Sequence, residues 1–221
     1  SPGQFVMIYM PPEKGTMLPR PFSIYQVDRR RQELALLIQV KGKGTALLYS
    51  AGVGEVFKVL GPLGKGFPKP LPRSLIIGGG AGIAPLVFLA ATVPDSCTLI
   101  YGARTAEELI CPPEGFQSPT PLQYLEATED GSRGEKGTVV DICRSLVDKS
   151  SAIYACGPRP MLAALSTLAC ERGLPAWFSL EERMACGIGA CRGCVVATTD
   201  GYRRVCRDGP VFPAEEVIFY A

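Results

Sequence analysis

Histidine is absent from this sequence of 221 residues. The absence excludes Ser-His-Asp and Cys-His catalytic triads, metal sites with imidazole ligands and a histidine general base. Long apolar runs are also missing, and none approaches the ~20 residues of a membrane helix, so we expect a soluble protein with no membrane partner. The chain opens on Ser1-Pro2-Gly3, without an initiating methionine, and its first residues do not predict a signal peptide.

Net charge is small, at +2, which argues against a nucleic-acid-binding surface. The charge is unevenly distributed, since residues 1–73 carry 11 Lys and Arg against 4 Asp and Glu. A basic first third suits an anionic ligand such as a pyrophosphate, although a solvated basic face would have the same composition. With 47% hydrophobic and 20% charged residues, the chain has enough apolar material for a sizeable core.

Turn-forming residues divide the chain into three segments. In residues 1–73, short apolar stretches separated by Gly and Pro predict a small antiparallel β barrel. We expect its strands at residues 5–9, 22–27, 33–41 and 55–60, a short helix that begins at Thr45, and a linker from Gly61 to Pro72.

The second segment, residues 74–178, alternates strands with helices, which is typical of a parallel sheet with crossover helices. We expect strands at residues 74–77, 98–101, 122–127 and 152–155, and helices at residues 85–91, 139–147 and 160–172. The third segment, residues 179–221, is rich in loops and predicts a hairpin of residues 195–199 and 202–205.

Four of the nine cysteines gather near the carboxyl end, as Cys186-x4-Cys191-x2-Cys194 followed by Cys206. Plant-type ferredoxins hold a 2Fe–2S cluster with this spacing. The intervening glycines leave the backbone free to wrap a cluster and to direct N–H groups at its sulfurs. A zinc ion on four thiolates is the alternative, although such sites usually show paired C-x2–4-C knuckles. Unpaired thiols need reducing conditions or a metal, so we expect a cytoplasmic protein.

A glycine run from Gly78 to Leu86 follows a predicted strand and opens a predicted helix. Glycines there let the backbone approach a phosphate, and a helix N-terminus supplies N–H donors and a favourable dipole. Ile83 stands where the third glycine of G-x-G-x-x-G would be, so a tight turn without a ligand is the alternative. Cys156-Gly157-Pro158 also lies between a strand and a helix, and predicts either a nicotinamide-facing element or a buried thiol.

Arg20-Pro21-Phe22-Ser23, with Gly44-Thr45 further on, offers groups suited to a planar ring that carries phosphates. An arginine can fork onto a phosphate, an aromatic ring can stack, and a hydroxyl can reach a ring nitrogen. By themselves, Phe22 could equally be barrel core and Arg20 a surface charge.

Taken in order, these motifs resemble the electron-transfer subunits of the NAD-dependent (class 1B) dihydroorotate dehydrogenases, a family of the ferredoxin-reductase superfamily. The resemblance covers essentially the whole chain, and its most specific parts are Glu181 to Cys191 and Val205 to Phe212. It implies a β barrel plus α/β fold with three parts. Residues 1–73 would be an antiparallel FAD barrel that lacks its first strand, residues 74–178 a parallel-sheet NAD(P) domain, and residues 179–221 a 2Fe–2S module.

The resemblance also implies roles for individual residues. Arg20-Pro21-Phe22-Ser23 would meet the flavin, with Arg20 on its pyrophosphate and Ser23 at the isoalloxazine edge. Leu37, Ile38 and Gln39 would line the adenine or ribityl side, and Gly44 and Thr45 would contact the pyrophosphate. Gly79, Gly80, Gly82 and Cys156 would frame the nicotinamide dinucleotide, and Cys186, Cys191, Cys194 and Cys206 would be the iron ligands.

The implied function is electron transfer in pyrimidine biosynthesis. An FMN-containing partner subunit would oxidise dihydroorotate, and electrons would pass through the cluster and FAD to NAD+, in a heterotetramer with two copies of each subunit. No catalytic base for dihydroorotate stands out in this chain. A sulfide, sulfite or hydrogenase partner is one alternative, and a zinc-stapled binding module is another. The choice between NAD and NADP stays open, because no acid directly follows the strand at residues 98–101 while Arg104 could meet a 2′-phosphate.

Overall fold

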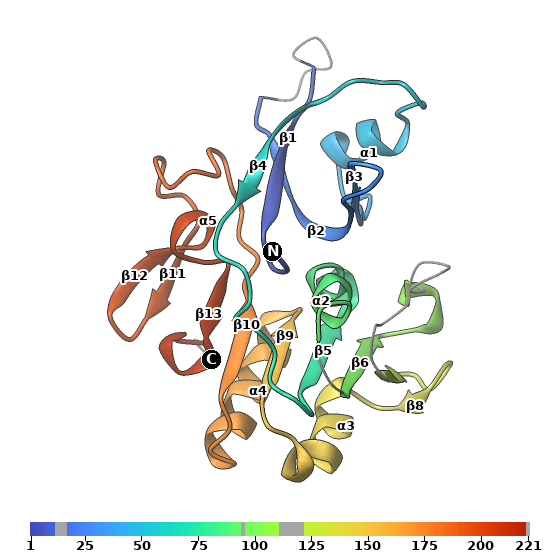
Figure 1. Cartoon of the computed structure of the whole chain (residues 1–221), viewed down its shortest axis with the longest axis vertical. Coiled ribbons are helices and arrows are strands. Elements are labelled where there is room, and N and C mark those ends of the chain that lie inside the picture. The colour runs from blue at the N-terminus through green and yellow to red at the C-terminus, as the bar shows by residue number, and fades with distance from the viewer. Residues whose placement is uncertain (12–16, 94–95, 111–121, 220–221) are drawn as a thin grey trace.

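The computed structural model describes residues 1–11, 17–93, 96–110 and 122–219, which form two lobes (Figure 1). One lobe contains a four-stranded sheet, and the other contains a seven-stranded sheet with its helices. Among the described residues, none of the helices has the length and apolar character needed to cross a bilayer.

The first lobe is an antiparallel sheet in the order β3-β2-β1-β4. Within the described residues, β3 and β4 each pair with a single neighbour, so the sheet is open, in agreement with the predicted incomplete barrel. The strands are β1 (Phe5–Tyr9), β2 (Arg20–Asp28), β3 (Glu33–Leu36) and β4 (Lys58–Leu63), and the helix α1 (Lys43–Tyr49) lies between β3 and β4.

Several boundaries predicted for this lobe are wrong, among them the start of β4, which lies at Lys58, three residues after the predicted one. β4 continues through Gly61-Pro62-Leu63, a stretch predicted to be a linker. An edge strand tolerates proline and glycine, and Gly61 packs so closely on β1 that a Cβ there would lie 2.7 Å from Cγ1 of Val6. β3 ends at Leu36, five residues before its predicted end. α1 begins at Lys43, and Thr45 is its third residue.

The second lobe is a sheet in the order β13-β10-β9-β5-β6-β7-β8, parallel except for β13. The predicted strands and helices of the second segment are confirmed with boundaries shifted by one or two residues. β8, β10 and β13 were not predicted, because these short strands show no alternation and depend on pairing with neighbouring strands. The elements are β5 (Leu75–Gly79), α2 (Ile83–Ala90), β6 (Cys97–Ala103), β7 (Leu122–Thr128), β8 (Glu135–Lys136), α3 (Val139–Leu146), β9 (Ile153–Cys156), α4 (Arg159–Glu171), β10 (Ala176–Ser179) and β13 (Val211–Pro213).

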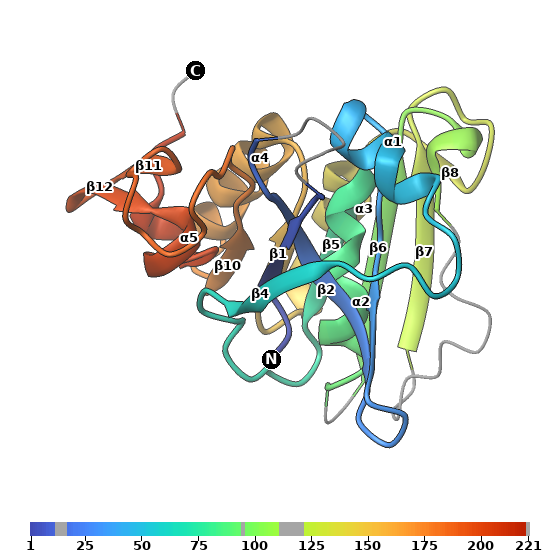
Figure 2. The same ribbon diagram turned by 90° about the horizontal axis from the view of Figure 1, so that it is seen from above.

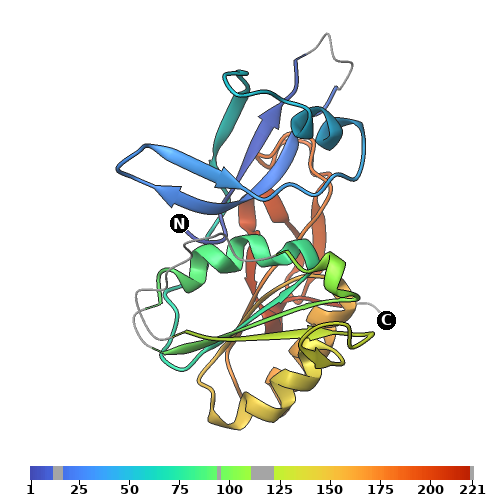
Figure 3. The same cartoon turned by 90° about the vertical axis from the view of Figure 1, so that its right-hand side faces the viewer.

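Side chains of β5 alternate between the two faces of this sheet. Leu75 and Ile77 pack with residues of α3 and α4, whereas Ile76 packs with residues of α2. α2 therefore lies between the parallel sheet and the first lobe, where it contacts β2 (Figure 3). This arrangement brings the glycine turn between β5 and α2 to the junction of the two lobes.

The third segment is attached to both lobes. Its strand β13 pairs antiparallel with β10, at the edge of the seven-stranded sheet. The predicted hairpin is confirmed as β11 (Val195–Thr198) and β12 (Gly201–Arg204), and a short helix α5 (Val205–Asp208) follows. Figure 2 shows these elements at the opposite side of the molecule from β7 and β8. Cys194 and Cys206 share one apolar core with Phe5 and Met7 of β1, so the segment is not a separate core.

Candidate functional site

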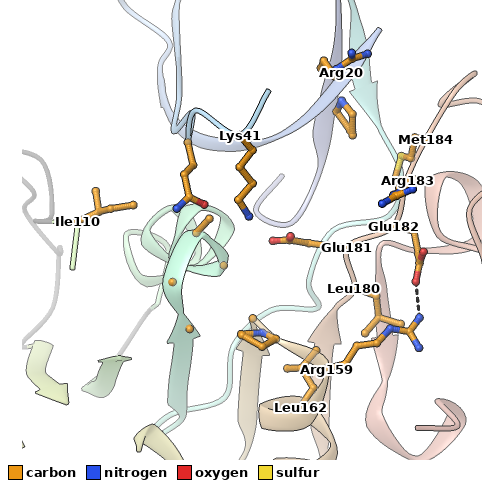
Figure 4. A pocket seen from close by; sticks show the side chains of 18 of the residues that line it. Arg20, Lys41, Ile110, Arg159, Leu162, Leu180, Glu181, Glu182, Arg183 and Met184 are labelled. Atoms are coloured by element: carbon orange, nitrogen blue, oxygen red, sulfur yellow. Dashed lines mark hydrogen bonds and ion pairs between the residues drawn. The ribbon is translucent and has the colours of Figure 1, made fainter. Parts of the chain in front are cut away.

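A cavity of about 1060 Å³ lies at the junction of the two lobes (Figure 4). Loops next to β2 and β3 form one wall, the glycine turn after β5 forms another, and the segment after β10 forms a third. The volume suits a dinucleotide, and an excess of basic side chains suits its negative pyrophosphate. The charged residues that line the cavity are Arg20, Lys41, Arg104, Glu108, Arg159, Glu181, Glu182 and Arg183.

The glycine turn is packed tightly against the end of β9. Gly82 has a right-handed helical φ of −63°, but a Cβ there would lie 2.4 Å from the carbonyl oxygen of Cys156. Gly80 has a φ of +53°, which favours glycine, and a Cβ there would meet nothing within 4 Å. α2 begins directly after this turn, and its first N–H groups have no partner within the helix. The turn therefore has the geometry of a phosphate-binding helix start.

Arg20 lies over the beginning of α1. Its Nη1 donates a hydrogen bond to the carbonyl oxygen of Leu18 at 2.6 Å. A Cβ on Gly44 would lie 2.9 Å from Nε of Arg20, so only glycine leaves this guanidinium in place. The structure thus brings Arg20 and Gly44 together, as predicted for a pyrophosphate contact.

Thr45 uses its hydroxyl within its own loop. Its Oγ1 accepts hydrogen bonds from the N–H groups of Lys41 at 2.9 Å and Gly42 at 3.1 Å. The same hydroxyl donates to the Gly42 carbonyl at 2.9 Å. One donor and two acceptor positions are then filled, so a phosphate at this loop would meet backbone N–H groups instead of the hydroxyl.

The predicted cofactor residues divide into two sets. Phe22 is half-buried against the apolar core of the first lobe, and Leu37 is half-buried against the core around α2. Those that line the cavity are Arg20, Pro21, Gln39, Gly79, Gly80 and Gly82, whereas Phe22, Ser23, Leu37, Ile38, Gly44, Thr45 and Cys156 do not line it. The roles given to these residues stay predictions.

Cys156 lies beneath the cavity floor, not at its surface. Its thiol is completely buried, and burial raises its pKa well above the usual range. Sγ of Cys156 lies 3.9 Å from Oε1 of Glu181. The predicted alternative of a buried strand-end thiol describes its position, while the neighbouring Gly157 lines the cavity.

Glu181 and Lys41 are cavity residues to which the sequence pattern assigned no role. Glu181 lies two residues after β10 and points into the cavity, and Lys41 extends toward it from the first lobe (Figure 4). The surrounding protein raises the pKa of Glu181, and the nearby Lys41 opposes this effect. Glu181 was overlooked because β10 was not predicted. An acid just beyond the carboxyl end of a parallel strand is a candidate site residue.

The raised pKa of Glu181 predicts a pH-dependent effect of its removal. Between the ordinary pKa and the raised one, the folded chain binds more protons than the unfolded chain, so this group lowers stability as pH rises. We expect Glu181→Gln to raise the melting temperature slightly at pH 8 and by less at pH 5, in scanning calorimetry, because solvent in the cavity screens part of the effect. Glu215→Gln is the control, because Glu215 is an acid that does not line the cavity. An equal shift at both pH values would contradict the prediction.

The four clustered cysteines lie in two pairs. The Cys191 N–H donates to Sγ of Cys186 at 3.4 Å, and the Cys206 N–H donates to Sγ of Cys194 at 3.4 Å. Gly189 donates to Sγ of Cys206 at 3.1 Å. Cys194 and Cys206 are buried, Cys186 is half-buried and Cys191 is exposed. The backbone thus directs N–H groups at the sulfurs, as expected for a cluster-binding loop.

Hydrogen bonds from these N–H groups change the pKa values of the thiols that accept them. The N–H of Cys191 is the main cause that lowers the pKa of Cys186 to about 6, which favours the metal-binding thiolate. Burial, together with the neighbouring Cys194, raises the pKa of Cys206 to about 12. A bound cation would offset this cost, because coordination deprotonates a thiol.

The pairing also separates the two metal hypotheses. A structural zinc draws four ligands to a single centre, whereas a 2Fe–2S cluster divides four cysteines between two irons. The two sulfur pairs fit the binuclear cluster.

Comparisons with known proteins agree with this site. Residues 76–167 match the model of the oxidoreductase NAD-binding domain. Residues 181–218 match the iron–sulfur cluster binding domain of dihydroorotate dehydrogenase B. A solved NADH-dependent reduced ferredoxin-NADP oxidoreductase, studied for flavin-based electron bifurcation, is 32% identical with a TM-score of 0.86, over 99% of this chain and 79% of that one. The ferredoxin reductase of carbazole 1,9a-dioxygenase shares the fold, with 22% identity and a TM-score of 0.61 over 80% of this chain and 59% of that one.

Curated relatives are similar over nearly the whole chain. The dihydroorotate dehydrogenase B (NAD(+)) electron transfer subunit of Desulforamulus reducens is 40% identical, over 99% of this chain and 87% of the relative. The protein of the same name from Caldanaerobacter subterraneus is 40% identical over the same shares. The chain therefore belongs to the family of electron transfer subunits of NAD(+)-dependent dihydroorotate dehydrogenase B.

Proposed function

We propose that this chain carries electrons from an FMN-containing dihydroorotate dehydrogenase subunit, through a 2Fe–2S cluster and FAD, to NAD+. The observation that carries the proposal is the place of the two cysteine pairs beside the cavity. Met184 lines the cavity, and Cys186 stands two residues further on. Two residues span at most about 7 Å, so a cluster on this loop lies within a short transfer distance of a ligand in the cavity.

The first lobe fits the flavin end of such a ligand. Arg20 and Gln39 reach the cavity from this lobe, and Gly44 leaves room for the Arg20 guanidinium at the start of α1. When bound, a flavin exchanges two electrons with a nicotinamide and one at a time with a cluster. The protein's own contribution is to hold these partners in line and to neutralise the phosphates.

The second lobe fits the nicotinamide dinucleotide. In the turn after β5, the backbone of Gly82 packs directly against the end of β9, and α2 starts from the same turn. Arg159, at the start of α4, forms an ion pair with Glu182 at the cavity wall (Figure 4). These groups bind and orient the dinucleotide, and we assign the oxidation of dihydroorotate to the partner subunit.

The partnership and location follow from the same proposal. We expect a heterotetramer with two copies of each subunit, in pyrimidine biosynthesis. We expect it in the cytoplasm, where reducing conditions keep thiols such as the exposed Cys191 from oxidising.

A different redox partner is the second candidate function. It is favoured by the 32% identity to the NADH-dependent reduced ferredoxin-NADP oxidoreductase over nearly the whole chain. Both candidates share the cluster, the flavin and the nicotinamide dinucleotide, and they differ in which protein supplies the electrons.

One reconstitution experiment tests the proposal. The full chain is prepared anaerobically and its iron, sulfide and flavin are measured. It is then mixed with the FMN subunit, dihydroorotate and NAD+, and NADH is followed at 340 nm. We expect NADH to form only when both subunits are present. A chain loaded with iron and flavin that accepts electrons from NADH, but none from the FMN subunit, would favour the other redox partner.

A further inference from the structure

Arg104, which stands at the end of β6, does not have a free guanidinium. Residues Ala106–Glu108 form a 3₁₀ turn that folds Glu108 back onto it. Oε2 of Glu108 accepts hydrogen bonds from the Arg104 backbone N–H at 3.3 Å and from Nε at 3.2 Å. Oε1 forms a further close ion pair with Nη2. The sequence places this acid four residues beyond the arginine, and only the turn brings it to the end of the strand.

A second acid approaches the same arginine from the next strand. The Glu129 N–H donates to the Ala103 carbonyl at 3.2 Å, which fixes the loop after β7 beside β6. Glu129 and Glu108 both raise the pKa of Arg104, with Glu108 as the main cause. The Arg104 guanidinium is thus already paired with the Glu108 carboxylate and lies in the field of a second acid, so this end of the cavity does not favour a phosphate dianion.

The position of the Arg104–Glu108 ion pair in the sheet suits an interaction with the ribose of a bound dinucleotide. β6 is the immediate neighbour of β5, from which the glycine turn begins, and both Arg104 and Glu108 line the cavity. In dinucleotide-binding α/β folds, an acid beyond the glycine motif accepts a hydrogen bond from the ribose 2′-hydroxyl, whereas an arginine accommodates a 2′-phosphate. In this chain both residue types are present, and the acid, Glu108, is paired with the arginine, Arg104.

We propose that Glu108 is the residue by which this cavity selects a nicotinamide dinucleotide with a free ribose 2′-hydroxyl. Glu108 accepts from that hydroxyl, keeps Arg104 engaged, and repels a 2′-phosphate. The inference rests on the proposed function, since it concerns the dinucleotide that receives the electrons.

Glu108→Gln tests the proposal, because it removes the charge and keeps the shape. In the full chain loaded with its cofactors, the Kd values of NAD+ and NADP+ are measured by isothermal titration calorimetry. We expect the Kd of NADP+ to fall about tenfold, the scale of one gained hydrogen bond to a charged group. The Kd of NAD+ should rise about threefold or less. Glu107→Gln is the matched control, since Glu107 is exposed and does not line the cavity.

A ratio of the two Kd values that is the same in Glu108→Gln, Glu107→Gln and the unaltered chain would overturn the proposal. The single variant Arg104→Ala gives an independent measurement if Glu108→Gln does not fold. We expect it to leave NADP+ as weakly bound as before, because Arg104 is already held by Glu108. A selective loss of NADP+ binding in that variant would show that Arg104 binds the 2′-phosphate, and the proposal would be wrong. Tight NAD+ binding without electron exchange with the FMN subunit would instead contradict the proposed function alone.

Discussion

Replacing Cys191 by serine is expected to abolish electron transfer from the partner subunit while NADH oxidation by the flavin continues. Cys191 is exposed, so the change should not disturb the core. Serine is a poor iron ligand because the thiolate is the metal-binding group. We expect coupled NAD+ reduction to fall more than about 100-fold, since loss of an outer-shell partner alone can cost 10–100-fold at a metal site.

The measurement combines three readouts on one anaerobic preparation of Cys191→Ser. Iron and sulfide content should fall, coupled activity with the FMN subunit should be lost, and reduction of ferricyanide by NADH should persist. Cys170→Ser is the control, because Cys170 is an exposed thiol on α4, outside the cysteine pairs. Full coupled activity in the Cys191 variant would refute the role given to the cluster.

Replacing Gly82 by alanine is expected to cause the largest loss at the nicotinamide side. The φ of Gly82 is −63°, a value that alanine adopts readily, so backbone strain does not enter. The added methyl group would lie 2.4 Å from the carbonyl oxygen of Cys156 and 2.7 Å from the Gly157 nitrogen. Both are backbone atoms, so the turn after β5 and the end of β9 must move apart. A displacement of about 1 Å can cost about 100-fold in rate, and we expect NADH oxidation to fall by that amount.

The control for Gly82→Ala is Gly52→Ala, because a Cβ on Gly52 would meet nothing within 4 Å. Stopped-flow reduction of the flavin by NADH measures the effect, and the visible spectrum of the cluster shows that the variant is folded. The loss should appear in the NADH reaction and leave dithionite reduction of the cluster intact. An unchanged rate of flavin reduction would contradict the idea that this turn frames the dinucleotide.

Local patterns predicted much of the fold. β1 has the predicted boundaries, Phe5–Tyr9, because its apolar run follows Pro2-Gly3 and ends just before Pro11. The helices α2, α3 and α4 were predicted to within two residues, because each follows a turn signal and a strand. β10 was not predicted, because its four residues, Ala176–Ser179, show no alternation of apolar and polar side chains. Their strand conformation depends on pairing with β9 and β13.

Some residues of the candidate site could likewise be predicted from local sequence, and others depend on tertiary packing. Cys191 and Cys206 are predicted ligands because ligand spacing is a property of the chain, and their role stays a prediction. The position of Cys156 could not be predicted, since its burial depends on the Gly82 turn packing over the end of β9. The meeting of Glu181 with Lys41 joins residues 140 positions apart in the numbering, from different lobes.

The amino-acid sequence alone determined the cysteine spacing, the glycine turn and the alternation of strands and helices, because these depend on backbone freedom and on neighbours a few residues away. The tertiary structure decided which of these elements share a cavity. It also decided that Glu108 engages Arg104 and that β13 completes the sheet next to β10. Such contacts follow from strand order and from the packing of α2 between the lobes, which depend on the whole core and not on any local pattern.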